Sequence, residues 1–410
     1  MSLVTGAVLV IAAYIIAGQR HPGMDSAVYQ WGALAVLHGQ PLYESLHLPS
    51  PWADLPFTYP PIAALFFLPL APFPLHGTWG VMAALSALAL GVTVRVSLVS
   101  LLRKQPPEWL LNVLVLVPIG LQPIWSTIGL GQVNLLLMAI ILLDVLALKG
   151  KRYSGVLIGV AAAIKLTPLI FIAHLILTRR HADAARAAGT FVALQGLGWL
   201  LLPADSRRFF TGAMMAGNGN RTFEAANQSI NGLVQRLSGE APDAFAISLT
   251  LGVVCLAVHA ILVRALHRHG QHLAALLATA FCGLLISPVT WTHHWVWVVP
   301  LCLLLGYRIY RRGLTSHGLA TLGLLLVVLL TFSVDFRLFV PIGDRLELHW
   351  TTLETLVGNA YLLAAMMVGL VGAVLVATHR PATHRPATAG GRIPSQRQPE
   401  ERALTTPRPW

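Results

Sequence analysis

The sequence predicts an all-α polytopic integral membrane protein, and three observations lead to this fold class. The 410 residues are 56% hydrophobic and only 11% charged, whereas a soluble domain carries about 25% charged residues. Apolar runs recur along the chain at close to the roughly 20 residues that cross a bilayer. Most of the 28 basic residues stand at the ends of these runs, so the net charge of +12 indicates membrane orientation and not nucleic acid binding.

The predicted helices follow one another with few polar interruptions. The first run, Leu3–Ala17, lacks a basic start and a small-residue cleavage site, which favours a retained helix over a signal peptide. A polar loop at 19–58 follows, and apolar sequence then continues from Tyr59 almost to Leu102. Further spans are predicted at roughly 109–128, 132–148, 154–178, 184–203, 243–264, 272–287, 294–307, 314–333 and 351–377. We therefore expect about 11 to 12 transmembrane helices.

Lys and Arg residues set the predicted orientation, because they collect on the cytoplasmic side of membrane proteins. Three polar stretches, 19–58, 204–242 and 334–350, then fall on the outward side, together with the corner at Ser287–His294. The basic residues that mark the cytoplasmic side are Arg103, Lys104, Lys149, Lys151, Arg152, Arg179, Arg180, Arg186, Arg264, Arg268, Arg308, Arg311 and Arg312. Chemistry carried by the polar stretches is therefore expected on a single membrane face.

One segment does not fit this alternation of sides. Lys149–Arg152 and Arg179–Arg180 both have the composition of cytoplasmic clusters, yet only one helix of ordinary length, 154–178, separates them. Pro168 disfavours helical geometry at the residue before it and removes a backbone donor. Either 154–178 is a broken, re-entrant hairpin around Lys165–Pro168, or one of the two clusters departs from the rule.

The C-terminal end differs in composition from the rest. From about residue 378 the chain repeats Thr-His-Arg-Pro-Ala and is rich in Pro, Arg, Thr and Gln, which is typical of a disordered segment. We predict one membrane-embedded domain over 1–377 and a disordered, basic cytoplasmic tail over 378–410, suited to contact with anionic lipids and without a catalytic role.

Asp25 is the first candidate for chemistry, since it lies where the chain leaves the first apolar run. A carboxylate there is partly desolvated, and it can act as a general base if its pKa suits the acceptor. The alternative is structural: Asp25 is the N-cap of an amphipathic interfacial helix with Val28, Trp31, Leu34 and Ala35 on its apolar face. The residues alone leave both interpretations open.

His293 and His294 are the second candidate, within the segment SPVTWTHHWVW. Histidine can donate a hydrogen bond to a phosphate or relay a proton near neutral pH, and a helix N-terminus favours an anion. The alternative is an interfacial aromatic belt, because Trp291, Trp295 and Trp297 are typical of a membrane boundary.

Several polar residues are weaker candidates. Gln132 and Asn134 follow two glycines at a helix start, where they serve either helix packing or substrate contact. Lys165 lies far from the cytoplasmic clusters, and a lysine at mid-depth is costly. Asn227 and Gln228 lie in a loop whose Asn and Gly residues also suit ordinary turns. Other charged residues on the predicted outward side are Arg207, Arg208, Arg221, Arg236, Asp335 and Asp344.

The sequence shows no motif for a metal or a cofactor. Cys255, Cys282 and Cys302 lie in apolar runs as small hydrophobic residues, and none has a CxxC or Cys/His metal spacing. The chain contains no P-loop and no GxGxxG after a strand. We therefore expect neither a metal nor a cofactor.

Six blocks follow one another along the chain: GMDSAVYQWGALAVLHGQPLY, FTYPPIAALFFLPL, GLGQVNLLL, GVAAAIKLTPLIF, NQSINGL and SPVTWTHHWVW. In this order, over roughly residues 1–330, they resemble glycosyltransferase family 87, the actinobacterial polyprenyl-phosphate-mannose-dependent mannosyltransferases of the GT-C superfamily. The specificity of this resemblance comes from the ordered set.

The resemblance implies a GT-C fold with an amphipathic first outward loop, and an inverting transferase on the outer face of the plasma membrane. Its donor would be polyprenyl phosphate mannose and its acceptor a glycolipid, with phosphatidylinositol mannoside as the nearest functional type. Asp25 would deprotonate the acceptor hydroxyl, and His293 or His294 would stabilise the leaving phosphate. The residues predicted to bind the donor phosphate or the substrate are Tyr59, Gln132, Asn134, Lys165, Asn227 and Gln228.

The single acid at the first loop departs from the usual GT-C pair, which argues against a carboxylate-bound metal. The alternatives within this class act on lipomannan or lipoarabinomannan, or transfer arabinofuranose. A lipid-linked sugar transporter is a different class, but the sequence shows no internal repeat of the kind transporters carry. A non-catalytic assembly subunit is the third functional class. The protein is expected to be a monomer.

Overall fold

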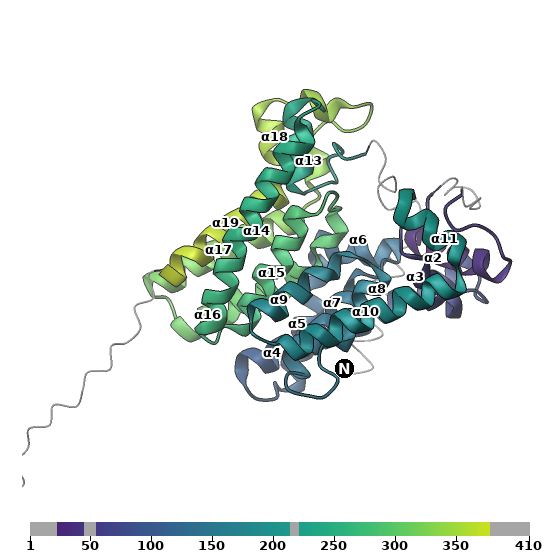
Figure 1. The fold of residues 1–410 in the computed structure, drawn as a ribbon. Helices are drawn as coiled ribbons and strands as arrows, with labels where there is room; N and C mark the ends of the chain where they lie inside the picture. The colour runs from purple at the N-terminus through teal and green to yellow at the C-terminus, as the bar shows by residue number, and fades with distance from the viewer. Residues whose placement is uncertain (1–22, 45–54, 214–220, 378–410) are drawn as a thin grey trace, which may run out of the picture.

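The computed structural model describes three stretches of the chain, residues 23–44, 55–213 and 221–377. Their regular secondary structure is helical, and extended backbone pairs within them only at an isolated bridge between Asn227 and Trp291 (Figure 1). The all-α fold class is therefore confirmed. The predicted first helix, Leu3–Ala17, and the predicted tail, 378–410, lie outside the described residues.

The helices divide into an N-terminal and a C-terminal set (Figure 1). The first set comprises α2 Met24–Leu37, α3 Pro61–Phe66, α4 Leu75–Leu102, α5 Glu108–Leu116, α6 Gln122–Leu130, α7 Asn134–Leu142, α8 Val156–Ile164, α9 Ile170–Leu177, α10 His181–Leu201 and α11 Pro203–Arg208. The second comprises α13 Ile230–Ser238, α14 Ala244–Arg268, α15 His272–Ile286, α16 Val298–Arg312, α17 Ser316–Ser333, α18 Thr352–Gly358 and α19 Ala360–Ala377. Short 3-10 and π turns join them: η1 Leu68–Leu70, η2 Val117–Gly120, η3 Leu143–Ala147, η4 Thr167–Leu169, η5 Phe209–Ala213, η6 Thr292–Trp297, η7 Phe336–Phe339 and η8 Leu346–His349.

Three described helices are long and apolar enough to cross a membrane, namely α4, α14 and α17. Two bent pairs add up to two more spans: α5 and η2 with α6, at 83°, and α18 with α19, at 71°. By length and composition the described residues thus give three to five candidate spans, and the count of about 11 to 12 for the whole chain stays a prediction. Shorter apolar helices lie beside them at Asn134–Ala147, Thr167–Leu177 and His272–Ile286. Proline and glycine interrupt the backbone ladder, and such breaks divide several apolar runs into shorter helices.

The segment 154–178 is the re-entrant hairpin that was one of the two predicted alternatives. Its ends lie side by side, since Arg180 Nη2 donates to Ser154 Oγ at 2.6 Å and Arg186 Nε donates to the Ser154 carbonyl at 2.7 Å. The arms α8 and α9 are each about 12–14 Å long, less than half of a bilayer core of about 30 Å. Both basic clusters therefore lie on one side, and Lys165 stands at the tip of the hairpin.

Helix α14 shows the surface expected of a membrane span. Its side chains Leu249 and Ile261 are 58% and 72% exposed, as suits contact with lipid. In contrast, Trp295, Phe332 and Tyr361 are buried, and their rings pack together with centroids 4.2–5.9 Å apart. This aromatic cluster joins η6 to α17 and α19, and it fixes the segment that carries the two adjacent histidines.

Candidate active site

The polar segments of the chain meet at one cavity of about 810 Å³. Its lining draws on α2, α6, the tip of the hairpin, η6, η7 and the loops before α3 and α13. The stretches that the charge pattern placed on a single face therefore do converge. The charged and polar side chains in the lining include Asp25, Tyr59, Gln132, Lys165, Arg221, Glu224, His293, His294 and Arg337.

Asp25 lies in the first turn of α2, but it does not cap the helix. The N-cap is Gly23, whose φ of 84° and close approach to Trp79 Cβ leave no room for a side chain. The Gly23 N–H donates to the Gly129 carbonyl at 2.8 Å, which fixes the start of α2 against α6. No side chain caps this helix, so the predicted N-cap role of Asp25 is wrong. Its Oδ2 atom is buried without a hydrogen-bond partner, and the residue lines the cavity.

Burial raises the pKa of Asp25 to about 6, and the nearby Lys165 charge and Gln132 partly oppose this rise. A carboxylate with this pKa is mostly ionised at neutral pH, yet it accepts a proton far more readily than an ordinary aspartate. Such a value suits a general base that works near neutrality.

A buried network of hydroxyl and amide groups holds α2 against the start of α7. Tyr29 Oη donates to Gln132 Oε1 at 2.8 Å, and Gln132 Nε2 donates to Tyr59 Oη at 3.1 Å. Tyr43 Oη donates to the Tyr59 carbonyl at 2.6 Å. Tyr59 and Gln132 are both predicted site residues, and both line the cavity in orientations that these hydrogen bonds fix. Tyr29 is a member that the sequence did not single out.

Lys165 connects the hairpin tip to the histidines. Its ammonium donates to Asn134 Oδ1 at 3.0 Å and lies 3.2 Å from His294 Nε2. An ammonium can only donate, so His294 accepts through Nε2 and carries its proton on Nδ1. Asn134 Nδ2 and Thr127 Oγ1 each donate to the His293 carbonyl at 3.0 Å. The predicted residues Asn134, Lys165, His293 and His294 thus form one connected group.

The two histidines are neutral hydrogen-bonding groups. Their ring centroids are 4.7 Å apart at a near-perpendicular angle of 88°. Burial lowers the pKa of both His293 and His294 well below the ordinary value, and the Lys165 charge lowers it further. The Nε2 atom of His293 is buried without a hydrogen-bond partner, so it is available to a ligand in the cavity.

Two arginines supply positive charge to the cavity. Arg337 binds Asp335 through two hydrogen bonds of 2.8 and 2.6 Å, so Asp335 is an ion-pair partner there. Arg221 pairs with Glu224 and lies 5.5 Å from the Trp291 ring centroid. Arg337 was missed by the sequence analysis. The other predicted loop arginines do not line the cavity: Arg208 pairs with Glu44, and Arg236 is buried against carbonyl groups.

Asn227 and Gln228 are completely buried behind the cavity. Asn227 Oδ1 accepts the Thr290 N–H at 2.9 Å. Gln228 Nε2 donates to the Gly358 carbonyl at 2.7 Å, and its Oε1 accepts the Tyr361 N–H at 3.1 Å. These two amides hold the loop, the histidine corner and α19 together. They position the site, since neither lines its cavity.

A smaller apolar cavity of about 60 Å³ adjoins the same group. Lys165 and His294 belong to the lining of both cavities. The remaining lining is mostly apolar and comes from α7, α9 and α15, for example Met138, Phe171 and Leu284. Lys165 and His294 therefore lie between the 810 Å³ polar cavity and the smaller apolar cavity.

Comparison with known proteins gives consistent matches. The family model of glycosyltransferase family 87 matches residues 57–288. A polyprenol-phosphate-mannose-dependent alpha-(1-2)-phosphatidylinositol mannoside mannosyltransferase of Mycobacterium tuberculosis is 32% identical over 397 residues, covering 91% of the chain and 90% of the relative. A polyprenol-phosphate-mannose-dependent alpha-(1-2)-phosphatidylinositol pentamannoside mannosyltransferase of Mycolicibacterium smegmatis is 36% identical over 318 residues, covering 74% and 75%. No solved structure matches the chain significantly.

Proposed function

The chain belongs to glycosyltransferase family 87, and on this premise we propose that it transfers mannose from polyprenyl phosphate mannose to a phosphatidylinositol mannoside. The names of the relatives support this donor and this class of acceptor. The single structural observation that carries the proposal is the cavity that brings a buried carboxylate, with one oxygen free of hydrogen bonds, together with Lys165 and two histidines. Transfer proceeds with inversion at the sugar carbon.

Asp25 is the proposed general base. Its free Oδ2 accepts the proton of the acceptor hydroxyl while the hydroxyl oxygen attacks the sugar carbon. The bond from that carbon to the phosphate oxygen breaks, and its electron pair leaves on the phosphate. The proton on Asp25 removes one negative charge and the leaving phosphate gains one, so the total charge of the site is unchanged. The step requires no oxidant or reductant.

The leaving phosphate is proposed to bind beside Lys165. The ammonium supplies positive charge there, and His294 Nδ1 and His293 Nε2 supply hydrogen bonds. Arg221 and Arg337, each paired with an acid, are two further cations at the cavity wall. Tyr59 and Gln132 complete the wall around the sugar, held in place by their own hydrogen bonds.

The two adjoining cavities suit a donor with two chemically different ends. The polar cavity takes the phosphosugar and the acceptor, and the apolar cavity beside Lys165 takes the first part of the polyprenyl chain. The distribution of Lys and Arg supports placing the polar cavity on the outer face of the plasma membrane. The protein is proposed to act as a monomer.

The proposed chemistry uses no metal. The acids in the described cavity lining are Asp25 and Glu224, and Glu224 is already paired with Arg221. A divalent cation of the magnesium or calcium type requires several oxygen ligands, which this lining does not gather.

The direct test is a transfer assay with purified protein and radiolabelled polyprenyl phosphate mannose. Phosphatidylinositol mannosides of increasing mannose number are offered as separate acceptors. A new α-mannosylated lipid, identified by mass spectrometry, supports the proposal and shows which acceptor length is used. Transfer only from a polyprenyl phosphate arabinofuranose, or movement of labelled donor across vesicles without a product, would reject it.

A further inference from the structure

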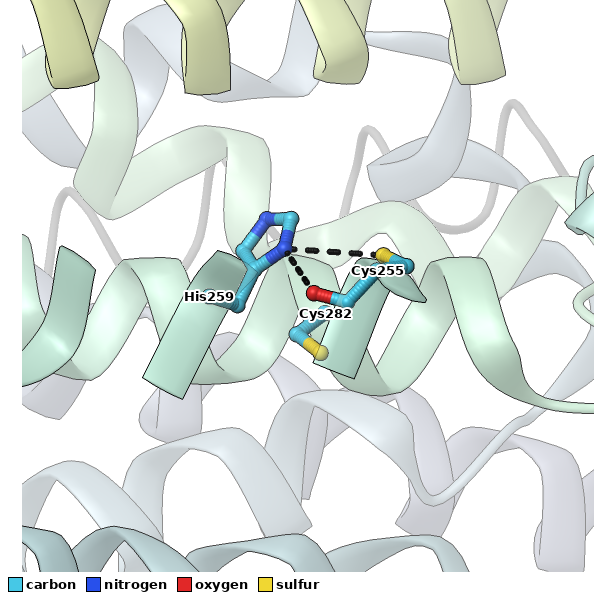
Figure 2. Close-up of side chains that lie close together, drawn as sticks. All are labelled: Cys255, His259 and Cys282. Carbon is cyan, nitrogen blue, oxygen red and sulfur yellow. Dashed lines mark hydrogen bonds between the residues drawn. The ribbon is translucent and has the colours of Figure 1, made fainter. Parts of the chain in front are cut away.

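A cysteine–histidine cluster joins two helices away from the catalytic cavity. Figure 2 shows Cys255 and His259 of α14 close to Cys282 of α15, with dashed lines from the His259 ring to the sulfur and the carbonyl oxygen of Cys255. The thiol sulfurs and one histidine nitrogen all lie within 4.8 Å of one another. Cys255 Sγ and His259 Nδ1 are 3.5 Å apart. None of the three residues lines the 810 Å³ cavity, so the cluster is independent of the proposed mannosyl transfer.

The expectation that the cysteines have no metal-ligand spacing overlooked one helical relation. Cys255 and His259 are four residues apart, and such residues lie on the same face of an α-helix. The third ligand, Cys282, is brought to them only by the packing of α15 against α14. This combination of thiolate and imidazole ligands is one that zinc prefers.

The geometry of the cluster suits a tetrahedral ion. With Zn–S bonds of about 2.3 Å and Zn–N bonds of about 2.0–2.1 Å, a tetrahedral site places neighbouring sulfur and nitrogen atoms about 3.5 Å apart. The separation of Cys255 Sγ and His259 Nδ1 has this value. In this structure Nδ1 also donates to the Cys255 carbonyl at 2.9 Å, so zinc binding requires the imidazole proton to move from Nδ1 to Nε2. We propose that Cys255, His259 and Cys282 bind one zinc ion that fastens α14 to α15.

The charge balance favours zinc over a monovalent ion. On binding, each of the two thiols releases one proton, and the imidazole binds in its neutral form. One Zn²⁺ with two thiolates and a neutral histidine has no net charge, which suits a position on a membrane-spanning helix. A copper(I) ion with the same three ligands carries one net negative charge. Burial of an uncompensated charge in an apolar region is costly.

A water molecule is the proposed fourth ligand. His259, unlike Cys255 and Cys282, also lines a cavity of about 70 Å³ between α14, α15, α16, α17 and α19. This volume exceeds the roughly 10–15 Å³ that a single water requires, so the cavity can supply the water. The site therefore needs no further protein side chain.

The test is the metal content of the purified, reduced protein. Wild-type protein is loaded with zinc sulfate, passed through a desalting column and measured by elemental mass spectrometry, with the expectation of about one zinc per chain. Cys282→Ala and His259→Ala should each lose most of this zinc. Cys302→Ala is the matched control, because Cys302 lies on α16 outside the cluster, and this variant should keep the full amount.

A second measurement uses only the wild-type chain, so it does not depend on the folding of a variant. Cobalt(II) is added in place of zinc, and binding at the cluster should produce thiolate-to-cobalt charge-transfer absorption that zinc then removes. Absence of this absorption, or unchanged zinc in Cys282→Ala, would overturn the proposal. So would stronger retention of copper(I) than zinc in competition, or a Cys255–Cys282 disulfide found by peptide mapping of protein from unreduced membranes.

Discussion

Replacing Asp25 by asparagine tests the proposed general base most directly. Asparagine has nearly the same size and keeps one carbonyl oxygen, but it does not accept a proton at neutral pH. Loss of a positioned base costs about 100- to 10,000-fold in rate. At about 1.36 kcal/mol for each factor of ten, this corresponds to about 2.7–5.4 kcal/mol of activation free energy. The expected result is a loss of kcat of this size.

The Asp25→Asn variant should lose activity without losing thermal stability. Burial raises the pKa of Asp25 to about 6, so the ionised carboxylate is disfavoured in the folded protein at neutral pH. The neutral amide removes this cost, and no capping bond is lost because Asp25 makes none. The thermal midpoint of Asp25→Asn should therefore equal or exceed that of the wild type, as measured by scanning fluorimetry in detergent.

The wild-type pH profile provides an independent check of the same role. A base must be ionised to act, so kcat/KM should fall tenfold per pH unit below the pKa of about 6 and level off above it. The matched control is Asp344→Asn, which alters an exposed acid on the same predicted face and should leave both rate and pH profile unchanged. Near-normal turnover in a folded Asp25→Asn protein would refute the assignment, and Glu224 would be the next acid to test. A misfolded Asp25→Asn protein would instead indicate a structural role.

Three further predictions follow from the site and the charge pattern. His294→Ala should lower kcat, because the lost stabilisation of the phosphate raises the activation free energy by about 2–4 kcal/mol. His293→Ala is measured beside it, and wild-type rates in both variants would remove the histidines from the mechanism. Transfer should survive EDTA, and activity lost on chelation and restored by magnesium, manganese or calcium would show metal dependence. Leu237→Cys should react with a membrane-impermeant maleimide in intact cells and Lys151→Cys only after lysis, whereas the reverse pattern would invert the topology. A reporter fused after the predicted tail tests the same topology and should lie on the cytoplasmic side, as Lys151 does.

The catalytic candidates were visible in the sequence because ionisable residues are rare at the ends of apolar runs. Asp25 and the histidine pair stood out for this reason, and the structure brings them to one cavity. Arg337 was missed because an arginine two residues after an aspartate resembles any solvent-exposed ion pair. Its place at the cavity depends on tertiary packing of η7, which has no local sequence signal.

The number of spans was less predictable than the helices themselves. Hydropathy identifies apolar segments, but it does not show whether a segment crosses the bilayer or turns back. Pro168 and the basic residues on both sides of 154–178 indicated a break, and they left two alternatives open. The contact between Arg180 and Ser154 decides between them, and it joins residues that are distant along the chain.

The re-entrant hairpin also explains why a lysine is tolerated at this depth. A buried ammonium is costly unless hydrogen bonds and an opposite charge compensate it. Lys165 has the amide of Asn134, the ring of His294 and the electrostatic influence of Asp25. In the proposed reaction Asp25 becomes neutral when it takes the acceptor proton, and the leaving phosphate gains a negative charge at the same time. The attraction that Lys165 exerts on Asp25 in the resting enzyme is thereby transferred to the phosphate. The cation is thus compensated before and after transfer, and its stabilising effect increases at the leaving group as the sugar–phosphate bond breaks.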